Sequence, residues 1–318
     1  MVMRPGHASS LDERPTLVVL CGPTASGKTG LALEIARRHP VEIVSADSRQ
    51  VYRGMDIGTA KATAQERTLV PHHLLDIVAP DEDFSVADFL PLARRVIADI
   101  HARGRLPLVV GGTGLYLRAL TEGLADVPGE DRDLRHRLQE EESRGGAGTL
   151  HRRLQVVDPV AAARTPAQNL VRIIRALEVW ELTGKPLSEH QAEHAFAEHP
   201  YRCLKLGLLP PRQELEQRIA DRVDAMLAQG LLAEVAGLLA AGFPPTLKAL
   251  QTIGYQEVVA HLRGDCDVAA MRERIVVNTR RYAKRQLTWF RRDNSIIWVD
   301  SLRESARIQS LIDDIMTP

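Results

Sequence analysis

The sequence predicts an α/β fold in which a parallel sheet is flanked by helices and carries an all-helical insertion domain. Three observations support this prediction: a glycine-rich loop stands between an apolar run and a helical segment, short apolar runs then alternate with amphipathic segments, and the alternation stops after residue 122. We therefore expect a loose tail at residues 1–14, a core with C-terminal helices from residues 15–122 and 200–318, and a helical insertion domain at residues 123–199.

The glycine-rich loop has the form G-x-x-x-x-G-K-[ST], which is typical of phosphate-binding loops when a strand precedes it and a helix follows it. Its backbone N–H groups and the N-terminus of the next helix favour an anion, Lys28 adds a positive charge, and the Thr29 hydroxyl is placed to bind Mg²⁺. The pattern predicts a P-loop NTPase-like core that holds a diphosphate or a nucleotide. The loop consists of Gly22, Pro23, Thr24, Ala25, Ser26, Gly27, Lys28 and Thr29.

Apolar runs short enough to be buried strands recur along the predicted core. They cover residues 16–21, 41–45, 74–78, 106–110, 203–208 and 295–299. Residues 51–72 combine glycines with mixed polarity, which predicts an ordered functional loop. Helical patterns cover residues 27–38, 85–103, a segment through Tyr116 and Leu120, 170–183, 211–229, 231–241, 249–262 and 268–292, followed by a final helix.

Composition excludes several classes of protein. The chain has 318 residues and zero formal net charge, so a nucleic-acid-binding surface would have to be a local patch. Its three cysteines are widely spaced, which argues against a zinc site or a disulfide framework and suits a reducing cytoplasm. We expect no signal peptide, because residues 1–14 lack an apolar segment, and no membrane span, because no run of about 18 apolar residues occurs.

Asp47 follows the second predicted strand, at the sheet edge where open α/β folds place their ligands. Its carboxylate could act as a general base or hold a metal ion through water. The alternative is an aspartate that only caps a turn. The neighbouring Ser48 and Gln50 carry groups that can hydrogen-bond to the edge of a nucleobase.

Two further segments suggest contact with a ligand. The glycines of Gly111-Gly112-Thr113-Gly114 end a buried strand at the same sheet edge, which indicates either a tight turn or close approach of a ligand backbone. Arg218 lies on a predicted helix and could clamp phosphate oxygens, or it could be an ordinary surface arginine. Residues 106–110 are followed by glycine rather than by an acidic residue, so the sequence does not support nucleotide hydrolysis.

The last long helical segment is strongly basic on one side. Residues 272–292 hold eight Lys or Arg and one acidic residue, Glu273. This one-sided charge predicts contact with the phosphates of a nucleic acid, against the alternative of a solvated face. Val276, Ala283, Leu287 and Phe290 share one face of the predicted helix, Arg281, Arg285 and Arg292 lie opposite, and Arg280, Lys284 and Arg291 lie on the flank.

Taken together, several segments resemble the tRNA dimethylallyltransferases, also called tRNA isopentenyltransferases. The resemblance extends from about residue 16 to residue 299, and the zinc-finger pattern of eukaryotic members is not found, so we expect a bacterial-type enzyme. The matching segments are the phosphate-binding loop, residues 47–61 (DSRQVYRGMDIGTAK), 71–76 (PHHLLD), 111–113 (GGT), 175–179 (RALEV), 253–255 (IGY) and 283–291 (AKRQLTWFR).

The resemblance implies transfer of a dimethylallyl group from dimethylallyl diphosphate to N6 of the adenine 3′ of the anticodon in certain tRNAs. It implies that the phosphate-binding loop, Arg218 and Mg²⁺ hold the diphosphate as a leaving group, that Thr29 binds the Mg²⁺, and that Asp47 accepts the proton from N6. The adenine would leave its stack to reach the pocket.

The resemblance also implies which residues meet the tRNA. The insertion domain would grip the anticodon stem-loop, and we expect a cytoplasmic monomer that does not bind membranes. The implied tRNA contacts are Asp47, Ser48, Arg49, Gln50, Thr113, Arg135, Gln168, Asn169, Leu170, Val171, Arg172, Ile253, Gly254, Tyr255, Arg281, Lys284 and Arg285.

Three other functions stay open at this point. An adenylate isopentenyltransferase would modify a free nucleotide, although the insertion and the basic helix argue against it. A small-molecule kinase with a phosphate-binding loop would use Asp47 on the metal or on the acceptor hydroxyl. An RNA-binding regulatory protein with the same loop would carry out no chemistry. The donor that binds the loop distinguishes them.

Overall fold

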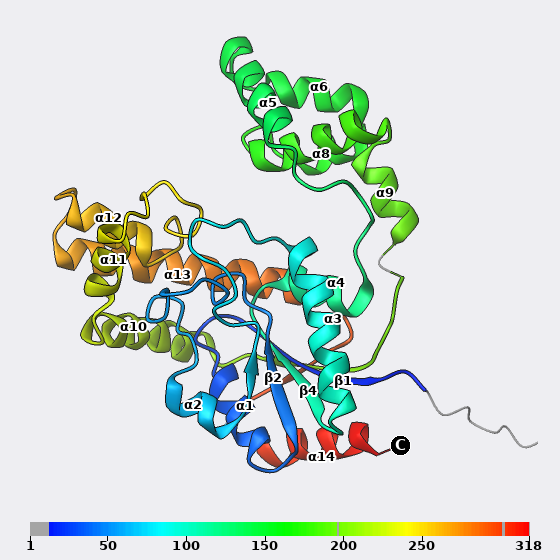
Figure 1. Cartoon of the computed structure of the whole chain (residues 1–318), viewed down its shortest axis with the longest axis vertical. Coiled ribbons are helices and arrows are strands. Elements are labelled where there is room, and N and C mark those ends of the chain that lie inside the picture. The colour runs from blue at the N-terminus through cyan, green and yellow to red at the C-terminus, as the bar shows by residue number, and fades with distance from the viewer. Residues whose placement is uncertain (1–12, 196, 301–302, 318) are drawn as a thin grey trace, which may run out of the picture. The chain divides into compact units, whose positions relative to one another are not determined.

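The computed structural model describes residues 13–195, 197–300 and 303–317, and the chain divides into two units (Figure 1). One unit contains the segments before Glu122 and after His199, and the other runs from Glu122 to His199. Of the tail expected at residues 1–14, residues 1–12 lie outside the described residues.

The first unit is built on a parallel sheet, which confirms the predicted fold class. Within the described residues it has six strands in the order β3-β2-β4-β1-β5-β6. The central strand β1 pairs with β4 on one side and β5 on the other, so that Val18 lies opposite both Leu108 and Leu204. The strands are β1 (Thr16–Cys21), β2 (Val41–Ser45), β3 (His72–His73), β4 (Leu106–Val110), β5 (Arg202–Leu208) and β6 (Ile296–Val299).

Helices cover both faces of the sheet, which is why the central strands are apolar throughout. Alternate residues of β1 point to opposite faces: Leu17 and Val19 belong to one buried cluster, and Val18 and Leu20 to another. The first face is covered by α3 (Val86–Ala102), α4 (Gly114–Glu122) and the end of α13, and the second by α1 (Lys28–Ala36) and α14 (Ser305–Met316).

The C-terminal helices α10 to α13 gather beside the sheet and form a third core (Figure 1). They pack around residues of the long loop after β2, including Tyr52 and Met55. Helix α13 joins this core to the sheet, because Ala283 belongs to the third core and Phe290 to the sheet. Its bounds and those of its neighbours are α10 (Arg212–Ala228), α11 (Leu231–Ala240), α12 (Tyr255–Leu262) and α13 (Val268–Phe290).

Among the described residues, no single helix is long and apolar enough to span a membrane. Helices α10 and α11 together have the length and composition, but they are bent by 55° at the break between them.

The structure corrects three predicted elements. The strand predicted at residues 74–78 is wrong, because Leu74 and Asp76 adopt φ angles of 62° and 56°, which no strand allows. The edge strand is the two-residue β3 instead. The loop predicted at residues 51–72 contains a short helix, α2 (Ala64–Leu69), which begins at a capping box formed by Thr63 and Glu66. The helix predicted at residues 249–262 begins only at Tyr255.

The second unit is helical throughout its described residues. Its helices enclose a separate core, in which Leu134, Leu150 and Ile173 come from three different helices and are all buried. The helices are α5 (Arg132–Gly145), α6 (Thr149–Val157), α7 (Pro159–Arg164), α8 (Leu170–Thr183) and α9 (Leu187–His194).

Candidate active site

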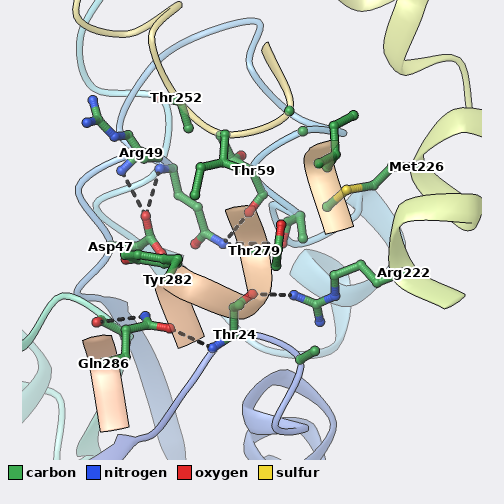
Figure 2. Close-up of a pocket in the computed structure, with 18 of the residues that line it drawn as sticks. Thr24, Asp47, Arg49, Thr59, Arg222, Met226, Thr252, Thr279, Tyr282 and Gln286 are labelled. Carbon is green, nitrogen blue, oxygen red and sulfur yellow. Dashed lines mark hydrogen bonds between the residues drawn. The ribbon is translucent and has the colours of Figure 1, made fainter. Parts of the chain in front are cut away.

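A pocket of about 450 Å³ lies in the first unit, at the carboxyl ends of the central strands (Figure 2). The phosphate-binding loop follows β1, Asp47 follows β2 and Gly112 follows β4, and all three line the pocket. Because parallel strands end at one sheet edge, residues far apart in the sequence meet here. Helices α10 and α13 supply further lining residues, among them Arg222, Tyr282 and Gln286.

The phosphate-binding loop needs its two glycines for its shape. Gly22 and Gly27 have φ angles of 139° and 96°, a region that favours glycine. A Cβ atom on Gly22 would also lie 2.7 Å from the backbone oxygen of Leu208. These conformations turn the chain sharply between β1 and α1, so that the loop leads directly into the N-terminus of that helix.

Lys28 lies folded against its own loop. Its ammonium group donates to the backbone oxygens of Gly22 and Pro23, at 3.1 and 2.8 Å. Burial, together with the nearby charge of Arg222, lowers the pKa of Lys28 to about 8, although the charge of Asp47 opposes the shift. In the described part of the chain no carboxylate forms an ion pair with Lys28, so its charge is available to a bound diphosphate.

Helix α10 brings two arginines to the loop, one turn apart. The guanidinium group of Arg222 donates to Thr24 Oγ1 at 3.2 Å, and burial lowers its pKa (Figure 2). Arg218 is ion-paired with Glu214 and reaches the backbone oxygen of Ser26 at 3.5 Å. Of these two arginines, only Arg218 was predicted from the sequence, although the four-residue spacing places both on one helical face.

Asp47 is both a turn cap and a wall of the pocket. Its Oδ1 atom accepts backbone hydrogen bonds from Arg49 at 2.8 Å and Gln50 at 3.4 Å, so the capping alternative describes a real contact. The carboxylate also lies beside Tyr282 (Figure 2), and burial together with the negative charge of Asp47 raises the pKa of that phenol. The cap fixes the carboxylate in the pocket, where it is the group able to accept a proton.

Gln50 also lines the pocket, and three hydrogen bonds fix its side chain. Its Oε1 accepts from Ser45 Oγ at 3.0 Å, and its Nε2 donates to the backbone oxygens of Thr59 and Ala60, each at 3.2 Å. These hydrogen bonds shape the pocket, and contact of this amide with a nucleobase edge stays a prediction. Ser48 is held by its backbone N–H, which donates to Thr113 Oγ1 at 3.1 Å.

Close protein contacts surround the glycines after β4. A Cβ atom on Gly111 would lie 2.2 Å from the backbone oxygen of Ala46. On Gly112 it would lie 2.2 Å from the amide of Gln286, and on Gly114 2.1 Å from the indole of Trp289. The backbone after β2 thus crowds Gly111, and helix α13 crowds Gly112 and Gly114. Contact of a ligand with Gly112, which also lines the pocket, stays a prediction.

Tyr255 lies in the protein core. Its side chain is fully buried, and its hydroxyl donates to Glu234 Oε1 at 2.5 Å. The carboxylate of Glu234 also accepts the backbone N–H groups of Asp56, Ile57 and Gly58. The expected tRNA contact of Tyr255 is thus corrected to a structural one, whereas the preceding residues 252–254 line the pocket.

The basic helix α13 has the predicted apolar face. Val276, Ala283 and Phe290 are buried, and the six basic residues from Arg280 onward are all exposed. Arg285 lines the pocket, with its guanidinium carbon 5.7 Å from the ring centre of Tyr282. The exposed basic residues are Arg280, Arg281, Lys284, Arg285, Arg291 and Arg292.

In the helical unit, Arg135 is engaged by acidic neighbours. Its guanidinium group pairs with the fully buried carboxylate of Glu178 at 2.8 and 2.9 Å and with Glu130 at 2.6 Å. Arg175 pairs with the same carboxylate. Of residues 168–172, Gln168, Val171 and Arg172 are exposed, whereas Asn169 caps α8 and Leu170 is half-buried. Contact of these residues and of Arg135 with tRNA stays a prediction.

The side chains around the pocket allow a metal ion that takes most of its oxygen ligands from a bound substrate and from water. The described residues contain no group of three or more His, Cys, Asp or Glu side chains suited to a metal. Thr29 is exposed at the start of α1 and lines the pocket. One hydroxyl fits Mg²⁺, which takes most of its oxygen ligands from substrate phosphates and water.

Comparisons with known proteins point to one family. The family model for IPP transferase matches residues 50–293, and the one for isopentenyl transferase matches residues 15–72. The chain is 55% identical to "tRNA dimethylallyltransferase 1" of Syntrophotalea carbinolica over 305 residues, covering 96% of this chain and 97% of that protein. It is 56% identical to "tRNA dimethylallyltransferase" of Geobacter metallireducens, covering 91% and 94%.

Comparison with solved structures points to the same family. The full-length tRNA isopentenylpyrophosphate transferase of Bacillus halodurans is similar with a TM-score of 0.70 and 42% identity, covering 95% of this chain and 97% of that one. A eukaryotic dimethylallyltransferase acting on tRNA is similar with a TM-score of 0.83 and 29% identity, covering 95% and 80%.

Proposed function

The chain belongs to the tRNA dimethylallyltransferase family and is a tRNA-modifying prenyltransferase, and from this premise we propose the reaction at its pocket. Dimethylallyl diphosphate is the donor, and the acceptor is N6 of the adenine 3′ of the anticodon in certain tRNAs. The observation that carries this proposal is the meeting of Asp47 with the phosphate-binding loop in one pocket. A proton acceptor thus lies beside a site for a diphosphate leaving group.

The loop, Lys28 and the arginines of α10 bind the diphosphate. Backbone N–H groups at the start of α1 and the positive charges of Lys28 and Arg222 stabilise negative charge on the diphosphate oxygen as it leaves the allylic carbon. Lys28 exchanges its bonds to Gly22 and Pro23 for bonds to the donor. Arg218, on the same helix, can donate further hydrogen bonds to the diphosphate.

Asp47 takes the proton. The bond between the allylic carbon and the diphosphate oxygen breaks, the bond between N6 and that carbon forms, and the diphosphate departs with the bonding electrons. The nitrogen then becomes acidic, and a carboxylate in reach can accept its proton as a general base. The fixed turn cap on Oδ1 leaves the second oxygen, Oδ2, for this proton.

Mg²⁺ fits the site through Thr29. When bound, it would neutralise charge on the diphosphate, with the Thr29 hydroxyl as a protein ligand.

The tRNA is bound by both units. The exposed basic residues of α13 suit the phosphates, and Arg285 reaches from this face into the pocket. Ser48, Arg49 and residues 253–254 line the pocket that the flipped adenine would enter, and Thr113 holds the backbone of Ser48. In the helical unit, Gln168, Val171 and Arg172 are the exposed positions of the segment that we assign to the anticodon stem-loop. We further propose that the protein acts as a monomer in the cytoplasm, where its tRNA substrate is.

Mass analysis of tRNA tests the proposal. Incubation of the protein with dimethylallyl diphosphate, Mg²⁺ and an adenine-containing tRNA should add one dimethylallyl group to that adenine. A transcript with guanine at the position should gain nothing.

The rival functions give different results in the same assay. Transfer to free adenosine monophosphate but not to tRNA would indicate an adenylate isopentenyltransferase. Phosphorylation of a small molecule from ATP would indicate a kinase. Tight tRNA binding without any transfer would indicate a regulatory RNA-binding protein.

A further inference from the structure

The side-chain amide of Gln286 connects helix α13 to the phosphate-binding loop after β1 and to the glycine segment after β4. Its Oε1 accepts the backbone N–H of Thr24 at 2.8 Å, and its Nε2 donates to the backbone oxygen of Gly112 at 2.9 Å (Figure 2). The side chain is only 6% exposed. A buried amide that forms both hydrogen bonds holds its two partners at a fixed separation.

The first partner belongs to the donor side. Two side chains bind the backbone of the segment from Gly22 to Thr24: Lys28 donates to the oxygens of Gly22 and Pro23, and Gln286 accepts the N–H of Thr24. Arg222 contacts only the side-chain hydroxyl of Thr24. When Lys28 turns to the diphosphate, the segment loses its first contact. Gln286 then remains to hold the backbone of this segment during the reaction.

The second partner belongs to the acceptor side. Thr113, next to Gly112, accepts the backbone N–H of Ser48 and donates its own backbone N–H to Ala46, at 3.1 and 3.4 Å. The residues on both sides of Asp47 are thus tied to the segment that Gln286 holds. The position of the Asp47 carboxylate therefore depends on the position of Gly112.

From these contacts, and resting on the proposed function, we infer that Gln286 is a positioning residue that sets the distance between the donor loop and the Asp47 carboxylate. Both ends of its amide are occupied by backbone groups of the protein, so it acts through these groups. It keeps the diphosphate leaving group and the Asp47 carboxylate at the separation that the reaction needs. A misplacement of about 1 Å can slow an enzyme about 100-fold. This contact needs glycine at position 112, because a Cβ atom there would lie 2.2 Å from the Gln286 amide.

Two substitutions of Gln286 distinguish its hydrogen bond to Thr24 from its hydrogen bond to Gly112. Gln286→Met keeps the length of the side chain and removes both hydrogen bonds. Gln286→Glu keeps an acceptor for Thr24 but places a carboxylate against the oxygen of Gly112, so it disturbs the acceptor side alone. Gln309→Met is the matched control: Gln309 is a buried glutamine on α14 that shares a 2.7 Å hydrogen bond with His39 Nε2, far from the pocket in the fold.

The experiment measures single-turnover transfer, donor affinity and thermal unfolding for the wild type and the three variants. Both Gln286 variants should transfer about 10- to 100-fold more slowly. Donor affinity should fall for Gln286→Met and stay within about threefold of the wild type for Gln286→Glu, because the Thr24 bond survives. Lowering the pH should raise the rate of Gln286→Glu relative to the wild type at the same pH, since a protonated glutamate can donate to Gly112.

The possible failures are distinct. A wild-type protein without prenyl transfer to tRNA would overturn the proposed function. An active wild type with Gln286 variants at the wild-type rate would overturn this inference alone. So would a rate loss that Gln309→Met reproduces at equal loss of thermal stability, because the effect would then be one of general destabilisation.

Discussion

The hydroxyl of Tyr255 donates a 2.5 Å hydrogen bond to the carboxylate of Glu234, and burial followed by that negative charge raises the pKa of the phenol. The same carboxylate accepts three consecutive backbone N–H groups, of Asp56, Ile57 and Gly58, at 2.7 to 3.1 Å. Helix α11 thus fixes the loop whose next residues, Thr59 and Ala60, line the pocket.

Glu234→Gln should therefore destabilise the protein and loosen this loop. An amide offers one acceptor oxygen, and its NH₂ group faces backbone donors, so buried donors lose partners at a cost of roughly 1–3 kcal/mol. Denaturant unfolding and hydrogen exchange of residues 56–60 measure the two effects. Tyr255→Phe should cost less, about 1 kcal/mol. Glu216→Gln, at an exposed ion pair, is the control; equal effects of Glu234→Gln and Glu216→Gln would contradict the assigned role.

Donor binding should weaken as the pH rises above 8. Lys28 has a pKa of about 8, lowered first by burial, so it loses its proton above that pH before the donor arrives. A bound diphosphate favours the charged lysine and raises its pKa, so affinity should fall by up to about tenfold per pH unit above 8, with uptake of a proton on binding.

Calorimetry with dimethylallyl diphosphate, without tRNA, in two buffers of different ionisation enthalpy measures both quantities. Lys28→Arg is the matched variant: its guanidinium stays charged, so its affinity should vary little between pH 7 and 9.5. A wild-type affinity that is flat across this range would contradict the assignment of Lys28 to the diphosphate.

Asp47→Asn should slow transfer without disturbing the fold. The turn cap uses Oδ1, which asparagine retains, so the backbone contacts of Arg49 and Gln50 persist. General-base assistance is worth about 10²–10⁴-fold in rate, and the single-turnover rate should fall by that factor while donor and tRNA affinities change little.

The exposed Asp81→Asn serves as the control for charge loss. A near-normal rate for Asp47→Asn would exclude the general-base role. A loss of donor affinity that high Mg²⁺ restores would instead assign Asp47 to the metal site.

Replacing exposed basic residues of α13 should weaken binding of all tRNAs alike. Arg281→Ala and Lys284→Ala each remove one phosphate contact, so the slope of log affinity against log salt should become shallower by roughly 0.7–0.9 per contact. Filter binding at several salt concentrations measures the slope. Arg272→Ala is the control on the same helix, because Arg272 pairs with Asp224. A slope unchanged in Arg281→Ala and Lys284→Ala would make this face a solvated one.

The sequence by itself determined the fold class and the place of the chemistry. The glycine-rich loop between a strand and a helix is a local pattern with a local physical cause, and parallel strands bring Asp47 to the loop whatever else the chain does. The apolar face of α13 and its exposed basic residues could likewise be predicted from the sequence, because the α-helix has 3.6 residues per turn.

Only the tertiary structure decided which side chains hold the pocket together. Gln286 contacts Thr24 across 262 positions, Arg222 contacts the same residue across 198, and Glu234 contacts Ile57 across 177. A single glutamine, arginine or glutamate on a helix carries no local signal of such a partner, because the contact arises when packed helices close on the loops. The same reason governs the glycines after β4: their sequence showed that a close approach occurs, and the packing of α13 showed what approaches.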